Sequence, residues 1–192
     1  MSIFYLVRHG ETEWNRVGKI QGISDIPLND RGREQATILG TRLRGCQIDL
    51  IGTSPLSRAQ ETAQILAAHL DLGSPVVIPE LIERNYGEAE GSNGSDFYKT
   101  YPNGLGVAGR EPKENVEKRA IACLRDLASS SSHNHLLVAH GAVIRSMLEH
   151  CDPGHSVGKI PNCSVHKFSM KNERLVLKER DINPESFPQD AD

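Results

Sequence analysis

The chain has 192 residues, of which 38% are hydrophobic and 24% are charged, and its formal net charge is −3. This length is sufficient to bury a core, so we expect a single domain over residues 1–180, followed by a polar, loosely ordered tail over residues 181–192. The small net charge provides no basic field for nucleic acid. The first apolar run, residues 3–7, is too short for a signal-peptide core or a bilayer span, so no membrane partner is expected either.

The cysteines are widely scattered and include no Cys-x-x-Cys pair. They are Cys46, Cys123, Cys151 and Cys163. This pattern is typical of reduced thiols in a cytosolic chain, whereas a disulfide framework or a zinc site would place cysteines at short, paired spacings. We therefore expect a cytoplasmic protein.

Strand-like apolar runs alternate with helical periodicity along most of the chain. The spacing of apolar residues predicts helices over residues 30–43, 55–70, 112–129 and 142–150. The apolar runs predict strands over residues 3–7, 50–53, 75–78, 135–139, 163–170 and 173–178. The last two strands flank Lys171 and Asn172 and are expected to form an antiparallel hairpin. Such alternation indicates an α/β sandwich with a mainly parallel sheet, interrupted by an irregular stretch over residues 79–110.

Four predicted strands are each followed by a residue that can bind phosphate or move a proton. In chain order these residues are Arg8 and His9, then Ser54, Ser57 and Arg58, then Glu83, and finally His140 and Gly141. Taken singly, each has an ordinary structural or surface interpretation. Ligands of open α/β sheets bind beyond the carboxyl ends of the strands, and four such groups at one edge favour a functional site.

These residue types support a narrow range of chemistry. Two arginines match the oxygens of a phosphoryl group, and an amide at a helix start, that of Gly141, adds a donor. Two histidines provide a nucleophile and a cation or acid. A carboxyl group beside a phosphate dianion has a raised pKa, which suits a general acid. The chain has no carboxylate cluster of the kind that magnesium needs, so we expect phosphoryl transfer through histidine with no metal and no cofactor.

Four segments resemble the motifs of the histidine phosphatase superfamily, the phosphoglycerate mutase-like proteins. They are Leu6-Val7-Arg8-His9-Gly10-Glu11-Thr12, Ser54-Pro55-Leu56-Ser57-Arg58-Ala59-Gln60-Glu61-Thr62-Ala63, Leu81-Ile82-Glu83 with Gly87-Glu88-Ala89-Glu90-Gly91, and Val138-Ala139-His140-Gly141. The similarity extends from residue 3 to about residue 178. It implies a three-layer α/β/α sandwich of the phosphoglycerate mutase type.

The resemblance also implies roles for individual residues. His9 attacks phosphorus, and Glu83 protonates the leaving oxygen and later deprotonates water. Arg8, Arg58 and His140 hold the phosphoryl group in the transition state. The remaining phosphate- or substrate-binding positions are Asn15, Gln21, Gly22 and Gly141.

The preferred interpretation is a histidine acid phosphatase-type phosphomonoesterase that acts on small phosphorylated metabolites, as a monomer or homodimer. A mutase would need a lid that keeps water from the phosphoenzyme, whereas residues 84–110 are short, polar and glycine-rich, which favours hydrolysis. A third alternative is a binding module without turnover, but Arg8, His9, Arg58, Glu83 and His140 are all present. Residues 84–110 are expected to determine specificity. Lys99, Arg110 and Lys113 are interpreted as solvated surface in preference to an acidic-substrate site.

Two further motifs are interpreted as structural. Gly104-x-Gly106-x-x-Gly109 has the spacing of a dinucleotide fingerprint, but it does not follow a strand. His133 and His135 have no third ligand nearby, so a surface turn is favoured over a metal site.

Overall fold

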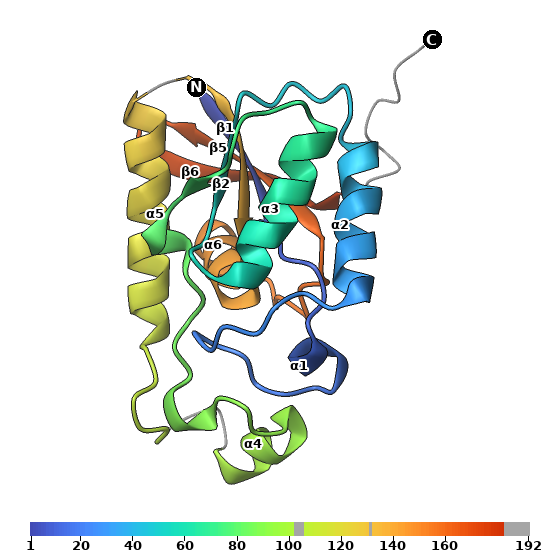
Figure 1. Ribbon diagram of the computed structural model, residues 1–192. Helices are drawn as coiled ribbons and strands as arrows, with labels where there is room; N and C mark the ends of the chain where they lie inside the picture. The colour runs from blue at the N-terminus through green and yellow to red at the C-terminus, as the bar shows by residue number, and fades with distance from the viewer. Residues whose placement is uncertain (102–105, 131, 183–192) are drawn as a thin grey trace.

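The computed structural model describes residues 1–101, 106–130 and 132–182 (Figure 1). The strands are β1 (Ser2–Arg8), β2 (Leu50–Thr53), β3 (Val76–Val77), β4 (Asn134–Ala139), β5 (Val165–Lys171) and β6 (Arg174–Ile182). The α-helices are α1 (Glu13–Arg16), α2 (Asp30–Arg42), α3 (Ser57–His69), α4 (Gly94–Thr100), α5 (Lys113–Ser130) and α6 (Gly141–Cys151). Two short 3-10 helices are η1 (Pro79–Leu81) and η2 (Gly87–Ala89).

All six strands belong to one sheet in the order β3-β2-β4-β1-β5-β6. Strands β3, β2, β4 and β1 pair in parallel, and β5 pairs antiparallel to both β1 and β6. The predicted mainly parallel sheet is therefore confirmed. The hairpin turn lies one residue later than predicted, at Asn172 and Glu173, whose φ values are 49° and 60°. Two positive φ values are what a two-residue turn needs to match the twist of its strands.

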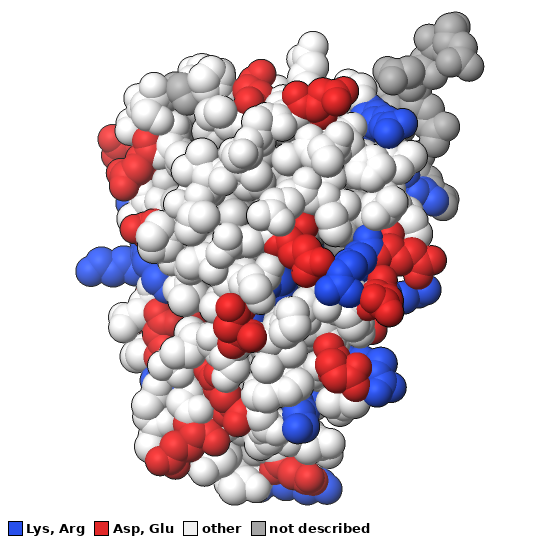
Figure 2. Space-filling view, in the orientation of Figure 1, with Lys and Arg blue, Asp and Glu red and all other residues white. Residues whose placement is uncertain are grey.

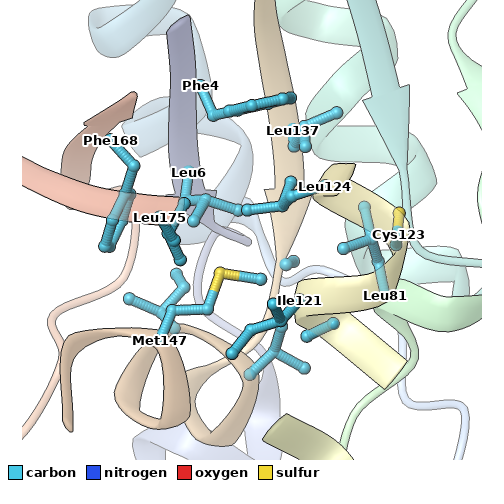
Figure 3. Close-up of a cluster of buried hydrophobic side chains, with 14 of the residues drawn as sticks. Phe4, Leu6, Leu81, Ile121, Cys123, Leu124, Leu137, Met147, Phe168 and Leu175 are labelled. Atoms are coloured by element: carbon cyan, nitrogen blue, oxygen red, sulfur yellow. The ribbon is translucent and has the colours of Figure 1, made fainter. Parts of the chain in front are cut away.

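Helices cover both faces of the sheet, which confirms the three-layer sandwich. Helices α2 and α3 pack beside each other over one face, and their core includes Val7 of β1 and Leu136 of β4 (Figure 1). Helices α5 and α6 cover the opposite face. Phe4, Leu6, Leu124, Met147 and Phe168 interlock there (Figure 3). Since the central strands bury side chains on both faces, they are continuous apolar runs in the sequence.

The structure adds two α-helices in segments for which no helix was predicted. Helix α1 is stabilised by a capping box between Thr12 and Asn15, and Asn93 caps α4 by accepting from the amide of Ser95. Both helices are too short to show a clear apolar period, so they escape pattern analysis. They lie at the lower end of Figure 1, beyond the carboxyl ends of the parallel strands.

The last strand differs from the prediction at its end. Strand β6 continues to Ile182, so residues 181 and 182 of the predicted tail belong to the sheet. The rest of that tail, residues 183–192, lies outside the described residues. Among the helices of the described residues, none is long and apolar enough to cross a membrane. On the face seen in Figure 2, acidic and basic side chains are interspersed, in agreement with the small net charge.

Candidate active site

The end of β1 places His9 in the interior of the protein. Its amide donates to the carbonyl of Ala139 on the neighbouring strand (3.1 Å), and its own carbonyl accepts from Asn162 Nδ2 (3.0 Å). The ring nitrogen Nδ1 lies 2.6 Å from the Gly10 carbonyl oxygen. A carbonyl can only accept, so Nδ1 carries the proton and Nε2 has the free lone pair. The side chain is fixed in one tautomer.

The turn after His9 is packed against the first turn of α2. A Cβ atom at Gly10 would lie 2.4 Å from the Gly32 carbonyl oxygen, and one at Gly32 would lie 2.2 Å from the Glu11 carbonyl oxygen. Both positions therefore require glycine. The Gly10 amide donates to Thr62 Oγ1 (3.1 Å). Gly32 was not predicted to contribute to the site, because nothing local marks it as a contact of the first motif.

Arg58 enters the site from the first turn of α3 and is completely buried. Its guanidinium group donates to the carbonyl oxygens of Gly22 (2.7 Å) and Ser24 (2.8 Å). With the Gln21 amide oriented so that its oxygen faces Arg58, that oxygen accepts from Nε (3.0 Å) and Nη1 (2.9 Å), and the Gln21 nitrogen donates to Thr12 Oγ1 (2.6 Å). Burial lowers the pKa of Arg58 to about 10, so the group remains a cation at neutral pH.

His140 follows β4 and is also completely buried. Its Nε2 lies 2.7 Å from Ser54 Oγ, which accepts a hydrogen bond from the Leu56 amide (3.3 Å). Its Nδ1 is buried with no hydrogen-bond partner among the described residues. The rings of His9 and His140 are 5.1 Å apart, centroid to centroid. Ser54 directly follows β2, so its contact with His140 connects the carboxyl end of β2 to the carboxyl end of β4.

Glu83 is held by backbone amides on two sides. Arg84 N donates to Oε1 (2.8 Å), and Ala142 N in the first turn of α6 lies 3.2 Å from both carboxyl oxygens. Burial raises the pKa of Glu83, although these amides and the charges of Arg58 and Arg8 act in the opposite direction. The helix amide that contacts this carboxyl group belongs to Ala142, whereas Gly141 had been predicted to donate to the phosphate.

Arg8 and Gly141 lie beside that carboxyl group. A Cβ atom at Gly141 would lie 3.8 Å from Arg8 Nε and 3.9 Å from Glu83 Oε2, in ordinary van der Waals contact with both groups. Arg8 Nη1 donates to the Ile160 carbonyl, and Nε is buried without a hydrogen-bond partner among the described residues. A buried charged donor of this kind is costly unless a ligand satisfies it.

The electrostatic environment opposes a positive charge on either histidine. Burial lowers the pKa of His9 well below 6.5, and the charges of Arg8 and Arg58 lower it further. The pKa of His140 is also lowered well below 6.5, mainly by burial and to a lesser extent by Arg58 and His9. Both imidazoles are therefore neutral at pH 7.

A cavity of about 260 Å³ opens at this edge of the sheet. It is lined by Arg8, Asn15, Lys19, Ile20, Gln21, Glu83, Tyr86, Gly141, Ala142, Arg145, Lys159 and Ile160. His9, Arg58 and His140 are at most 3% exposed and are not part of this lining. Sequence reasoning missed Lys19, Arg145 and Lys159, because they stand in three segments with no shared motif.

The other predicted positions have structural contacts. Asn15 Oδ1 accepts from Asn162 Nδ2 (3.2 Å), and Gly22 has no space for a side chain because Glu90 and Arg84 lie against it. Lys99 pairs with Asp96 (3.4 Å), away from the cavity lining.

The motifs that were interpreted as structural have no metal-binding arrangement in the described chain. The prediction of a surface turn is wrong for His135, which is buried in β4 and whose ring stacks on Phe4 with 5.0 Å between centroids. Gly104 of the glycine-rich motif lies outside the described residues. Within the residues described, no group of three or more His, Cys, Asp or Glu side chains is placed to hold a metal ion.

The mainly parallel sandwich, with its buried arginines and histidines at one edge, has the fold of the phosphoglycerate mutase-like phosphatases. The crystal structure of phosphoserine phosphatase from Entamoeba histolytica in complex with 3-phosphoglyceric acid matches it with a TM-score of 0.80 and 28% identity, over 95% of this chain and 98% of that one. The family model of the histidine phosphatase superfamily (branch 1) matches residues 4–183. The chain belongs to this superfamily.

Two curated relatives represent different activities. The chain is 35% identical over 188 residues to an uncharacterised phosphatase, PhoE, of Bacillus subtilis, covering 95% of this chain and 96% of the relative. It is 31% identical over 166 residues to a 2,3-bisphosphoglycerate-dependent phosphoglycerate mutase of Cytophaga hutchinsonii, covering 79% of this chain and 78% of the mutase. The protein is therefore an enzyme of the histidine phosphatase superfamily that has phosphatases among its relatives.

Proposed function

We propose that this protein is a phosphomonoester hydrolase that acts on small phosphorylated metabolites through a phosphohistidine on His9. The hydrogen bond from His9 Nδ1 to the Gly10 carbonyl carries the proposal, because it leaves the Nε2 lone pair available for attack on phosphorus. The low pKa of His9, caused by burial and the neighbouring arginines, keeps that lone pair unprotonated even in mild acid.

In the first step, His9 Nε2 forms a bond to phosphorus while the bond from phosphorus to the ester oxygen breaks. Glu83 gives its proton to the departing oxygen, so the product leaves as a neutral alcohol. Burial raises the pKa of Glu83, which favours the protonated carboxyl group that this step requires. The phosphoenzyme then carries the phosphoryl group on Nε2, and Glu83 is ionised.

In the second step, water attacks the phosphohistidine. Glu83 accepts a proton from the water as the new bond to phosphorus forms and the Nε2–phosphorus bond breaks. Inorganic phosphate leaves, and His9 returns to its neutral state with Nδ1 still donating to Gly10. Glu83 thus acts as acid in one step and as base in the other.

Three side chains are proposed to stabilise the charge on the phosphoryl oxygens. Arg8 Nε is a buried donor without a protein partner in the described chain, and Arg58 contributes a second fixed cation. Ser54 accepts from the Leu56 amide, so its hydroxyl proton is free to donate to His140 Nε2, which places the imidazole proton on Nδ1. That proton is available to a phosphoryl oxygen.

The polar residues around these groups complete the proposed binding site. Asn15 and Gln21 line the cavity with amide groups, and Gly141 lines it with backbone. Gly22 contributes through its carbonyl, which orients Arg58. The cavity volume of about 260 Å³ suits a small metabolite better than a larger ligand.

The test is release of phosphate from p-nitrophenyl phosphate. We expect turnover by the unmodified protein at mildly acidic pH, loss of at least about 10³-fold in His9→Ala, and no loss in the control His155→Ala, since His155 is exposed and lies outside the site. Rapid-quench labelling should detect an acid-labile phosphoenzyme. If no phosphomonoester in a panel is hydrolysed, a binding function without turnover replaces this proposal.

A second candidate activity is phosphoryl transfer between hydroxyl groups of one substrate. The observation in its favour is the 31% identity to a phosphoglycerate mutase. Incubation with 3-phosphoglycerate, followed by separate measurement of inorganic phosphate and of 2-phosphoglycerate, distinguishes the two. We expect phosphate release to be faster. Faster interconversion would establish the mutase in its place.

A further inference from the structure

The cavity wall has more positive charge than a phosphoryl group requires. Arg8 lies at the proposed phosphoryl site, but Lys19, Arg145 and Lys159 also line the cavity, and Glu83 is its one acidic lining residue in the described chain. Arg8 and the buried Arg58 already provide two cations for the phosphoryl dianion. Three further cations therefore remain without an assigned function.

The chain holds Lys159 in place from both sides. Arg145 donates from Nη1 to the Val157 carbonyl (2.6 Å) and from Nη2 to the Gly158 carbonyl (3.0 Å). On the other side of Lys159, the carbonyl of Ile160 accepts from Arg8 Nη1. The backbone of Lys159 is thus anchored between two arginines that themselves line the cavity, one of them at the proposed phosphoryl site.

Lys19 lies on a separate, equally anchored segment. Its amide donates to the Trp14 carbonyl (2.9 Å), and the residue forms an antiparallel bridge with Asn93. Its ammonium group lies 5.5 Å from the centroid of the Trp14 ring. Among the described residues, no carboxylate lies within ion-pair distance of Lys19, Arg145 or Lys159. Like charges lining one small cavity repel each other, and an anion bound between them offsets this repulsion.

We propose that Lys19 and Lys159 bind a second anionic group of the substrate, with Arg145 positioning Lys159, so that the preferred substrates are small phosphomonoesters that carry another negative charge. This inference rests on the proposed hydrolase function and specifies its substrate class. The second group is a carboxylate or a second phosphoryl group, since both are anions that ammonium groups bind as point charges.

Three matched substrates test the proposal. Glycerol 3-phosphate, 3-phosphoglycerate and glycerol 1,3-bisphosphate differ at the end opposite the scissile phosphate, which is a hydroxymethyl, a carboxylate or a second phosphoryl group. For the unmodified protein we expect kcat/KM to be at least about tenfold higher for one of the two acidic substrates than for glycerol 3-phosphate. The acidic substrate with the higher kcat/KM shows whether the second anionic group is a carboxylate or a phosphoryl group.

Substitutions then assign the preference to residues. Lys159→Ala and Lys19→Ala should each lower the ratio of kcat/KM between the preferred acidic substrate and glycerol 3-phosphate by about threefold to tenfold, mainly through KM. Lys159→Arg should restore most of the ratio, because it keeps the charge. The matched control is Lys118→Ala on the exposed side of α5, which should leave the ratio unchanged.

The outcomes separate this inference from the function on which it rests. Equal kcat/KM for all three esters, or a ratio that Lys159→Ala and Lys19→Ala leave unchanged, overturns the inference while His9-dependent hydrolysis stands. If the folded protein releases phosphate from none of the three esters or from p-nitrophenyl phosphate, the proposed function fails and the inference fails with it.

Discussion

Burial shifts the pKa values of His9 and Glu83 in opposite directions. For His9, desolvation and two neighbouring guanidinium groups favour the neutral imidazole. For Glu83, desolvation outweighs the amides and arginines that favour the carboxylate. Desolvation therefore disfavours charge on both groups, which favours an unprotonated base and a protonated acid at the same pH. This combination is what the two proposed steps require.

Replacing Glu83 with Gln tests its role as the acid. We expect Glu83→Gln to slow hydrolysis of an alkyl phosphate by about 10²–10⁴-fold, since the alkoxide is a poor leaving group without a proton. Formation of the phosphoenzyme from p-nitrophenyl phosphate should be slowed much less, because p-nitrophenolate leaves unaided. Burst kinetics with both substrates provide the measurement. Equal losses on the two substrates would show that Glu83 does not protonate the leaving group.

The two buried histidines predict a loss of stability in mild acid. Their pKa values in the folded state lie well below 6.5, the value of an exposed histidine. The stabilisation is therefore fully present above pH 6.5 and is lost as the pH falls, because only the unfolded chain binds the protons. Each histidine contributes a slope of up to about 1.4 kcal/mol per pH unit to the free energy of unfolding.

Urea denaturation between pH 7.5 and 5 measures this slope. His9→Asn should reduce it by up to about 1.4 kcal/mol per pH unit relative to the unmodified protein. Glu83 acts in the opposite direction, since burial raises its pKa and the folded chain retains its proton to higher pH. Glu83 is present in both proteins, so the difference between them reports the histidine. Identical slopes would contradict a depressed pKa at His9.

At the scale of elements, Glu90 connects the loop after α1 to the loop that carries Glu83. Its carboxylate accepts from the amides of Ile23 (2.9 Å) and Ser24 (2.8 Å) and from the amide of Tyr86 (3.1 Å). Partial burial alone would raise its pKa, but hydrogen bonds from Ser24 and Tyr86 lower it, so Glu90 is ionised. The Ser24 carbonyl in turn accepts from Arg58 (2.8 Å). Glu90 therefore positions a cation that it does not contact.

Glu90→Ala should disturb both loops. We expect kcat to fall by about tenfold or more and the free energy of unfolding to fall by about 1.5–3 kcal/mol, the range for hydrogen bonds to a charged group. The matched control is Glu88→Ala in η2, an exposed carboxylate in the same loop. Thermal unfolding and p-nitrophenyl phosphate kinetics test both variants. Equal behaviour of the two variants would show that Glu90 does not connect these loops.

At the scale of the whole molecule, stability depends on the two apolar layers on either side of the sheet. Phe168 of β5 is fully buried against the α5 and α6 side (Figure 3), whereas Val77 of β3 is 46% exposed at the sheet edge. Phe168→Ala should cost about 3–5 kcal/mol and lower Tm by roughly 6–20 °C. Val77→Ala should change stability by no more than about 0.5 kcal/mol. Calorimetry measures both, and a similar Tm for the two variants would contradict this account of the core.

The sequence by itself determined the sandwich and brought Arg8, His9, Arg58, Glu83 and His140 to one edge of it. Each of these residues follows a local signal, an apolar run or a helix start, and parallel strands end on the same side of a sheet. Local patterns also place the four long helices to within a few residues.

Only the tertiary structure decided which residues surround that edge. Three features involve segments that are distant in the chain and have no periodic pattern. They are the contact between Gly10 and Gly32, the hydrogen bonds of Glu90 to two loops, and the lining of one cavity by both Lys19 and Lys159. Hydrophobic periodicity records which side of an element is buried, but it contains no information on which irregular segments meet. Those contacts depend on backbone hydrogen bonds and close packing, which exist only in the folded chain.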